Sequence, residues 1–356
     1  RRVKDRLDEL EAEFEDVVRQ LSTPEVLADH DQLRTVGRRH SQLEPIVKAV
    51  RELRAAEQDL EAARQMLEHA DGAERDEMRA EMQSAQERIE QTDAALQVLL
   101  LPSDPNDERD VIVEIRGTEG GEEANLFAKD LFDMYTRYIA DKKWKLEILS
   151  VSHSERGGID DLTFKVSGDG VWSRLKHEGG THRVQRVPVT ESQGRIHTSA
   201  ATVTVLPEAD EVDVQIDAND LRVDVYRSSG PGGQSVNTTD SAVRITHLPT
   251  GIVVSMQDEK SQIQNRARAM QVLRARLLKE EQDRVSAEMS AQKRSQAGSG
   301  GRSEKIRTYN YKDNRVTDHR IGLTLHKLDK VLLGDLDDLH DALMADERTR
   351  QLAEGG

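Results

Sequence analysis

The chain has 356 residues, of which 51 are Lys or Arg, 67 are Asp or Glu and none is Cys, so its net charge is −16. This length predicts two or more domains, and the lack of cysteine excludes a disulfide framework, thiolate zinc sites and a cysteine nucleophile. No apolar run reaches the roughly 18 residues of a membrane-spanning helix, and no hydrophobic signal segment is recognisable. We therefore expect a soluble cytoplasmic protein with no membrane partner.

The charge is distributed unevenly along the chain. Residues 221–330 hold 20 basic and 12 acidic residues, whereas residues 1–220 hold 29 basic and 48 acidic residues. Because neutralisation of phosphates dominates nucleic-acid affinity, a basic block within an acidic chain indicates contact with a polyanion. A solvated basic face has the same composition, so the charge balance alone leaves both interpretations open.

The first hundred residues are predicted to be helical almost throughout. Helix-start chemistry around a proline predicts breaks at residues 22–25 and 41–45. Beyond the second break apolar side chains recur at helical spacing, Asp71 and Gly72 turn the chain, and another helix follows. We expect residues 1–102 to form an antiparallel helical arm with a structural or partner-docking role.

A linker is predicted at residues 102–107, and beyond it the apolar spacing changes from helical to alternating. The elements expected there are strands at 111–115, 145–151 and 162–166 and helices at 122–140 and 171–177. This mixture of strands and helices is typical of an α+β domain.

A second, smaller β domain is predicted to follow. Its expected strands alternate between apolar and polar residues over 202–206, 211–216 and 221–226, and a hairpin is expected over 243–256. A helix over residues 261–292 closes this domain with one apolar face, formed by Ile263, Met270, Leu273 and Leu277. A flexible hinge is expected at residues 296–303, followed by a basic extended stretch and a last amphipathic helix.

The predicted fold class is therefore multidomain α+β. We expect an N-terminal helical domain over residues 1–102 and a mixed α+β domain formed by residues 103–205 together with 302–356, which include the C-terminal helix. A small domain of β-sheet plus helix occupies residues 206–301.

The most unusual segment is the loop after the strand predicted at 221–226, where three glycines, a proline and Gln234 occur together. No Gly-Lys-Ser/Thr follows, which argues against a nucleotide P-loop. From Ser228 to Thr239 there is no Asp, Glu, His, Lys or Arg, so this loop cannot itself perform acid–base catalysis. A main-chain N–H in such a loop can still stabilise an oxyanion during ester hydrolysis; a long surface turn is the alternative.

Four segments together indicate a family. Residues 229–237 resemble the peptidyl-tRNA hydrolysis loop of bacterial class I peptide chain release factors. Residues 181–190 contain a Pro-x-Thr tripeptide, which resembles that of the family branch reading UAA and UAG; the other branch carries Ser-Pro-Phe there. Residues 117–124 resemble the family's helix-tip motif, and residues 302–310 resemble the hinge after its catalytic domain. The four motifs stand in family order across the whole chain.

The resemblance implies roles for individual residues. The catalytic tripeptide would be Gly232, Gly233 and Gln234, with the Gln234 backbone N–H stabilising the oxyanion and its side chain helping to select water. It also implies that a glutamine methyltransferase converts Gln234 to N5-methylglutamine. The residues expected to bind the codon are Gln185, Pro188, Val189, Thr190, His197, Thr198, Gly120 and Glu123. Those assigned to the hinge are Arg302, Ser303, Ile306 and Arg307.

These side chains suit single-stranded RNA, which proteins read by hydrogen bonds to base edges and by stacking on planar groups. The Thr190 hydroxyl can donate and accept, and His197 offers a flat ring. Gly120 and Glu123 are placed near the first base, where a uracil edge needs backbone or carboxylate partners. Basic side chains are expected to neutralise ribosomal RNA phosphates, and these are Arg266, Arg268, Arg274, Arg276, Arg302, Lys305 and Arg307.

The implied partners are the decoding site and the peptidyl-transferase centre of a 70S-type ribosome, the mRNA stop codon and P-site peptidyl-tRNA. A glutamine methyltransferase and a class II release factor GTPase are further expected partners. The factor would complete the ribosomal active site rather than act as a standalone enzyme. We expect no cofactor and no metal, since Glu122 and Glu123 lack accompanying ligands at metal-binding spacing.

Two other functions are alternatives to this hypothesis. A ribosome-rescue hydrolase would keep the glycine-rich loop but would not need codon-reading residues, and the Pro-x-Thr tripeptide argues against it. A helical scaffold or RNA-binding module would explain the helical arm and the basic block without any reaction. Hydrolysis of peptidyl-tRNA on ribosomes that carry a stop codon separates the three.

Overall fold

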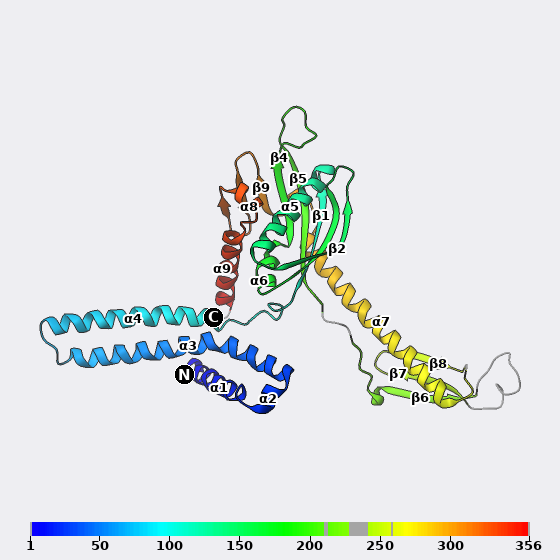
Figure 1. Cartoon of the computed structure of the whole chain (residues 1–356), viewed down its shortest axis with the longest axis horizontal. Helices are drawn as coiled ribbons and strands as arrows, with labels where there is room; N and C mark the ends of the chain where they lie inside the picture. The colour runs from blue at the N-terminus through cyan, green and yellow to red at the C-terminus, as the bar shows by residue number, and fades with distance from the viewer. Residues whose placement is uncertain (1, 210–212, 228–240, 258, 355–356) are drawn as a thin grey trace. The chain divides into compact units, whose positions relative to one another are not determined.

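The computed structural model describes residues 2–209, 213–227, 241–257 and 259–354 (Figure 1). The described chain falls into two compact units. One unit runs to Asp104 and resumes at Met344, and the other comprises Pro105–Leu343. The motif Gly232, Gly233 and Gln234 lies outside the described residues.

The predicted helical arm lies in the first unit, which also includes the end of the chain from Met344. The helices of the arm are α1 (Arg2–Gln20), α2 (Pro24–Ala28), α3 (His30–Leu67) and α4 (Ala73–Leu99), and α3 packs along α4. Gly72 adopts a positive φ of 56° in the turn between these two helices.

The break predicted at residues 41–45 is wrong, because α3 continues through Pro45. A proline inside a helix costs about 3 kcal/mol. Leu43, Val47 and Val50 flank it and are completely buried, and Leu43 packs in a cluster with Leu10 of α1. Apolar burial on both sides of the proline therefore outweighs its local cost.

The second unit contains the larger of two sheets. Among the described residues its strands are β1 (Val111–Glu119), β2 (Lys145–His153), β3 (Ile159–Ser167), β4 (Gly180–Arg186), β5 (His197–Pro207), β9 (Lys305–Asn310), β10 (Arg315–Asp318) and β11 (Leu323–Leu325). They lie in the order β11-β10-β9-β4-β5-β1-β3-β2. The pair β4–β9 is parallel and the other pairs are antiparallel.

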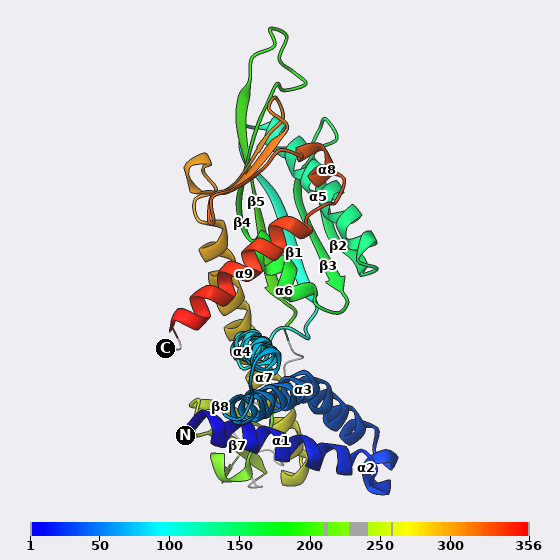
Figure 2. The ribbon, with the colours of Figure 1, turned by 90° about the vertical axis from the view of Figure 1, so that its left-hand side faces the viewer.

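Helices cover this sheet. They are α5 (Glu122–Asp141), α6 (Val171–Leu175), η1 (Lys176–Glu178), α8 (Leu328–Leu332) and α9 (Asp337–Glu354). The long helix α5 packs against β1, β3 and β5 (Figure 2), and its buried face, which includes Phe127, Leu131 and Met134, forms the centre of the core. The parallel pairing of β4 with β9 brings residues about 125 positions apart side by side.

The smaller sheet comprises β6 (Leu221–Tyr226), β7 (Ala242–His247) and β8 (Ile252–Met256), with η2 (Ala218–Asp220) leading into it. Helix α7 (Gln262–Ala297) packs on it through Ala269, Leu273 and Leu277. The predicted hairpin β7–β8 is confirmed.

Two predictions for this region are wrong. Asp213–Ile216 form no strand: the Val214 carbonyl accepts a hydrogen bond from Arg274 at 3.2 Å, so a side chain takes the place of a neighbouring strand. Ile263 is 81% exposed, because the buried row of α7 runs at four-residue steps from Asn265. The helix also extends to Ala297, which places the start of the expected hinge inside it.

Candidate RNA-reading surface and the loop of the smaller sheet

The hairpin β4–β5 carries most of the residues expected to read a codon. Gln185 lies opposite Thr198, and Arg186 lies opposite His197 at the last rung of the ladder. The loop between the strands turns through a hydrogen bond from the Glu191 N–H to the Pro188 carbonyl at 3.1 Å. Opposed residues of an antiparallel pair share a face of the sheet, so Gln185 and Thr198 form a pair directly beneath this loop.

The tip of the loop faces solvent. Val189 is 88% exposed and Thr190 is exposed, whereas Pro188 is buried and anchors the loop. The Thr190 hydroxyl is therefore free to meet a base edge.

Glu191 supports this loop and was missed from the sequence. Its Oε2 lies 3.0 Å from His197 Nε2, and its Oε1 accepts the Gln193 N–H at 2.8 Å. The carboxylate thus orients the His197 ring and holds the loop backbone. Its position next to Thr190 is the only sequence signal that pointed to it.

The second group of expected readers lies at the tip of α5. Gly120 has a φ of 119° and Gly121 a φ of 61°. A Cβ on Gly120 would meet the Ser199 Oγ at 2.6 Å, so only glycine permits this approach to the start of β5. The contact brings Gly120 beside the strand that carries His197 and Thr198.

The carboxylate of Glu123 is not presented to solvent. Glu123 is buried, its Oε1 lies 2.5 Å from Arg186 Nε, and its Oε2 has no hydrogen-bond partner among the described residues. Of the two partners expected at the first base, backbone or carboxylate, the carboxylate of Glu123 is therefore wrong, and the placement of Glu123 near that base stays a prediction. What the helix tip presents is backbone at the exposed Gly120 and Gly121.

The segment between α7 and β9 is held against the end of β1. Thr118 Oγ1 donates to the Gly300 carbonyl at 2.7 Å, and Glu119 accepts from the N–H of Arg302 at 2.9 Å and from its Nε at 2.6 Å. These bonds hold the pKa of Glu119 below its usual value, first through the Arg302 N–H. The turn, which includes η3 (Arg302–Glu304), therefore contacts the strand that leads into Gly120.

Of the residues assigned to a hinge, Ile306 and Arg307 lie inside β9, which is paired on both sides by β4 and β10. A change of backbone direction is thereby restricted to the turn before Lys305. The hinge assignment of Arg302 and Ser303 stays a prediction.

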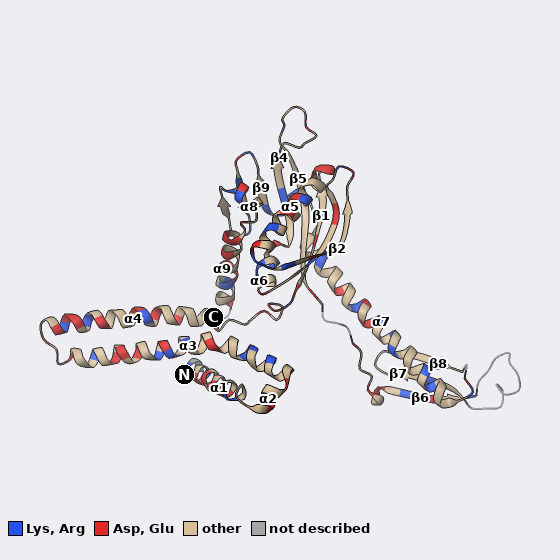
Figure 3. Cartoon of the chain, viewed as in Figure 1, with Lys and Arg blue, Asp and Glu red and all other residues tan. Residues whose placement is uncertain are grey.

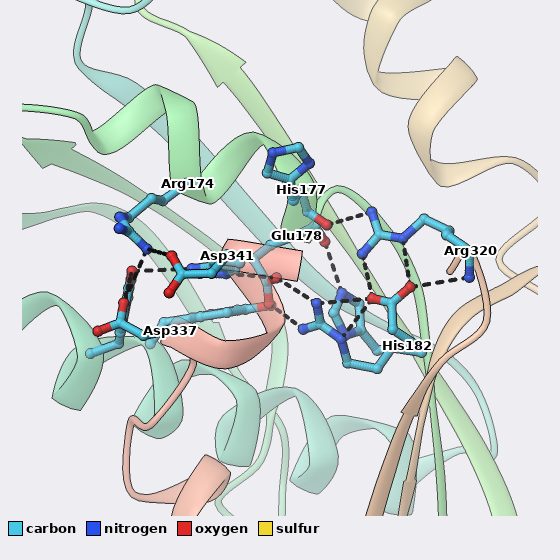
Figure 4. Close-up of polar contacts among 12 residues, drawn as sticks. Arg174, His177, Glu178, His182, Arg320, Asp337 and Asp341 are labelled. Carbon is cyan, nitrogen blue, oxygen red and sulfur yellow. Dashed lines mark hydrogen bonds and ion pairs between the residues drawn. The ribbon is translucent and has the colours of Figure 1, made fainter. Parts of the chain in front are cut away.

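A buried ionic network centres on Glu178, at the end of η1 and just before the start of β4 (Figure 4). Glu178 accepts from both terminal nitrogens of Arg307, at 2.6 and 2.8 Å, and the same guanidinium lies 3.2 Å from Asp318. His340 Nε2 and the Tyr135 hydroxyl lie 3.0 and 2.9 Å from the same Glu178 carboxylate. Arg307 is fully buried, so the expectation that it contacts RNA phosphates is wrong.

Electrostatics keep this network charged. Burial by itself would raise the pKa of the Glu178 carboxyl, but Arg307 and His340 hold that pKa well below the usual range. Burial would likewise lower the pKa of Arg307, and Glu178 raises it well above the usual value. Sequence reasoning missed Glu178, since a single glutamate between a short helix and a strand carries no motif.

His182 in β4 is buried in its neutral form beside this network. Its Nε2 lies 2.8 Å from the Glu178 carbonyl, which can only accept, so Nε2 carries the proton. Its Nδ1 then accepts from the Tyr309 hydroxyl at 2.8 Å. Burial and, after it, the charge of Arg307 lower the pKa of His182 to about 4.

The four arginines of α7 that were expected to contact phosphates, Arg266, Arg268, Arg274 and Arg276, are exposed. Figure 3 shows Lys and Arg positions along this helix. Three of these arginines also make local contacts. Arg268 lies 2.7 Å from Glu259, and Arg274 and Arg276 donate to the carbonyls of Val214 and Val253.

The glycine-rich loop arises between β6 and β7, where Tyr226 lies opposite Ala242. Asn265 in the first turns of α7 is completely buried and holds the base of this loop. Its Nδ2 donates to the Ser241 carbonyl at 2.7 Å and to the Glu259 carbonyl at 2.9 Å, and its Oδ1 accepts the Glu259 N–H at 3.0 Å. The amide thus ties the strand that leaves the loop to the helix.

Within the described part of the chain, no cluster of three or more His, Asp or Glu side chains is arranged to hold a metal ion. None of the described helices has the length and hydropathy needed to cross a membrane.

Known proteins resemble this chain over its whole length. Residues 10–203 match the family model of the PCRF domain, and residues 210–320 match that of the RF-1 domain. Peptide chain release factor 1 of Solidesulfovibrio magneticus is 57% identical over 339 residues, which cover 95% of each chain. Peptide chain release factor 1 of Carboxydothermus hydrogenoformans is 53% identical over 349 residues, or 98% of each chain. The solved structure of RF2 of Thermus thermophilus is 35% identical, covers 97% of this chain and 96% of its own, and has a TM-score of 0.50.

Proposed function

The chain belongs to the family of peptide chain release factors, and on this premise we propose that it reads the stop codons UAA and UAG in the ribosomal A site. Members of this family act in translation termination, in which the ester of peptidyl-tRNA is hydrolysed on the ribosome. The proposal concerns what this chain adds: which codons it accepts and which of its residues read them.

The hairpin β4–β5 is the observation that carries the proposal. It exposes Thr190 at its tip, and the ring of His197 lies near that tip and contacts Glu191. Below the tip Gln185 lies opposite Thr198. A hydroxyl, a flat ring and an amide within one hairpin can together meet the edges and faces of unpaired bases. Backbone groups at Gly120 complete the surface at the first base.

For hydrolysis we assign the reaction to Gly232, Gly233 and Gln234 in the loop between β6 and β7. A water oxygen attacks the ester carbonyl, the Gln234 N–H stabilises the resulting oxyanion, and the ester bond to tRNA then breaks. The 3′-oxygen of tRNA departs with a proton. No residue from Ser228 to Thr239 can transfer that proton, so the ribosomal site must supply the rest of the machinery.

The remaining assignments follow the same proposal. Residues 103–205 with 302–356 form the codon-reading part, residues 206–301 carry the hydrolysis loop, and the turn at Arg302 and Ser303 acts as the hinge between them. The methyltransferase that modifies Gln234 and a class II release factor GTPase are the proposed protein partners, and the cytoplasm is the proposed location.

Release of peptide from purified ribosomes programmed with UAA, UAG or UGA tests the proposal. We expect rapid release at UAA and UAG and little at UGA. Comparable release at UGA would contradict the codon assignment, and release without any stop codon would favour a rescue hydrolase. A protein that binds such ribosomes without releasing peptide would be an RNA-binding module.

A further inference from the structure

Arg186 ends β4, two residues before Pro188, and joins the reading hairpin to α5. The side chain is 14% exposed. Its Nε lies 2.5 Å from Oε1 of Glu123, and its Nη1 lies 2.5 Å from Oδ2 of Asp130 and 3.2 Å from the hydroxyl of Tyr311. One guanidinium therefore contacts the helix that carries the tip glycines and the residue that follows β9.

The shape of this contact requires an arginine. Glu123 and Asp130 are seven residues apart, so they lie on one face of α5 about two turns apart. The guanidinium lies 5.9 Å from the ring centroid of Phe127 and 5.1 Å from that of Tyr311. A planar fork can bond two carboxylates while it stacks on aromatic rings, whereas a lysine ammonium is a single point of charge.

We propose that Arg186 is a positioning residue for codon reading, which holds the tip of α5 at a fixed distance from the loop that carries Thr190. This inference rests on the function proposed above. The first base is assigned to the turn at Gly120 and the second to Thr190, and these two groups belong to different elements. Arg186 is part of the hairpin, and its ion pair with Glu123 connects it to the first turn of α5.

A second contact also joins the tip of α5 to the hairpin β4–β5. Gly120 packs against Ser199, which directly follows Thr198 in β5. This contact sets how closely the helix tip can approach, and it involves no charged group. The ladder of β1 with β5 ends just before the tip, at Glu119 opposite Ala200, and beyond that point the ion pair of Arg186 with Glu123 joins α5 to the hairpin.

A purely structural role predicts a different outcome from a positioning role. Removing the charge of Arg186 would leave the buried Glu123 carboxylate uncompensated and would destabilise the fold whatever the function. Arg186→Lys keeps the charge and removes the fork, so it separates the two roles. If Arg186 positions the readers, the loss appears in codon discrimination; if it only stabilises, the loss appears in thermal unfolding.

The experiment uses full-length protein and ribosomes programmed with UAA, with CAA as a first-base mismatch and with UGA as a second-base mismatch. The release rate is measured against factor concentration, which separates half-saturation from maximal rate. For Arg186→Lys we expect half-saturation on UAA to rise about tenfold and discrimination against CAA to fall by about the same factor, as contacts within one network do. The matched control is Asp133→Asn, also on α5, whose carboxylate pairs with Lys129 and not with Arg186.

The double variant Arg186→Lys with Glu123→Gln gives a further test. If the two residues act as one unit, the double variant discriminates against CAA as well as the single variant with the poorer discrimination does. Additive losses, or wild-type discrimination in Arg186→Lys, would overturn the inference. Failure of the wild-type protein to release peptide at UAA and UAG would instead overturn the proposed function, and this inference with it.

Discussion

The two sheets of the second unit differ in what they bury besides apolar side chains. Among the described residues, the larger sheet buries Glu178, Arg307 and Asp318 as a charged network in addition to its apolar core, whereas the buried polar side chains around the smaller sheet are those of Ser241, His247 and Asn265. Buried charges are costly unless each is paired, and they tolerate few alternative arrangements.

This difference matches what each sheet has to present. Under the proposed function the larger sheet carries the codon-reading groups on a hairpin and on a helix tip, so the relative position of these two elements matters. Under the same proposal the smaller sheet presents the residues between β6 and β7, and a mainly apolar core, with Asn265 bonded to the Ser241 carbonyl, is sufficient support for them. We expect perturbations of the first region to alter stability and selectivity, and perturbations of the second to alter the rate of reaction.

The strongest test of this comparison removes the centre of the network. Arg307→Met leaves Glu178 and Asp318 buried without their common partner, and breaking such a pair costs about 3–5 kcal/mol. The free energy of unfolding in urea measures the loss. Arg315→Met on the neighbouring strand is the control, because Arg315 is half-exposed and should change stability by less than about 0.5 kcal/mol. Equal losses in the two variants would refute the special role of the network.

In the domain of the smaller sheet, the largest expected effect is on the rate of peptide release and not on stability. Gln234→Pro deletes the proposed oxyanion donor, and loss of one such donor typically lowers turnover by roughly a hundred- to a thousandfold. Gln234→Ala keeps the N–H, so part of the water-dependent release should survive while larger nucleophiles gain access. Both variants should bind stop codons as the wild type does. Equal release rates for the two variants would return the side chain to the centre of the reaction.

The dependence of stability on pH tests the buried polar groups of the larger sheet. The folded pKa of His182 is about 4 because burial disfavours the imidazolium, whereas an unperturbed histidine has a pKa of about 6.5. The unfolded chain therefore takes up the proton first, and stability is lost as the pH falls from about 6.5 towards 4.

Between those limits His182 contributes a slope of at most about 1.4 kcal/mol per pH unit. His182→Gln should flatten the curve of unfolding free energy against pH, since an amide can still donate to the Glu178 carbonyl. His153→Gln, at an exposed position of β2, should leave the curve as it is. An unchanged slope in His182→Gln would show that another group titrates in this window.

The smallest expected effect is the most local. Thr190→Ala removes an exposed hydroxyl from the reading loop and should change the free energy of unfolding by less than about 0.5 kcal/mol. Loss of one hydrogen bond to a base should reduce discrimination at the second codon position by about tenfold. Competition between UAG-programmed and near-cognate ribosomes measures this ratio. A loss of stability without a loss of discrimination would place Thr190 in the support of the loop instead of its reading surface.

Local patterns in the sequence were enough to predict much of this molecule. The helical arm with its turn at Gly72 and the hairpin β7–β8 follow from periodicity and turn residues, which act within a few positions. The loop around Gln234 was recognisable for the same reason, since its glycines and its lack of charged side chains are visible in the sequence itself.

Other features were decided by packing between distant segments. Pro45 stays inside a helix because Leu43 and Val47 are buried beside it, and Arg307 resembled a basic surface residue until the pairing of β9 with β4 placed it on Glu178, 129 positions away. The same holds for Arg186, whose partners lie on a helix that precedes it by more than fifty residues. The sequence alone does not show whether a charged side chain is solvated or paired with a buried carboxylate. The tertiary fold decides this, because it brings the partner residue into contact.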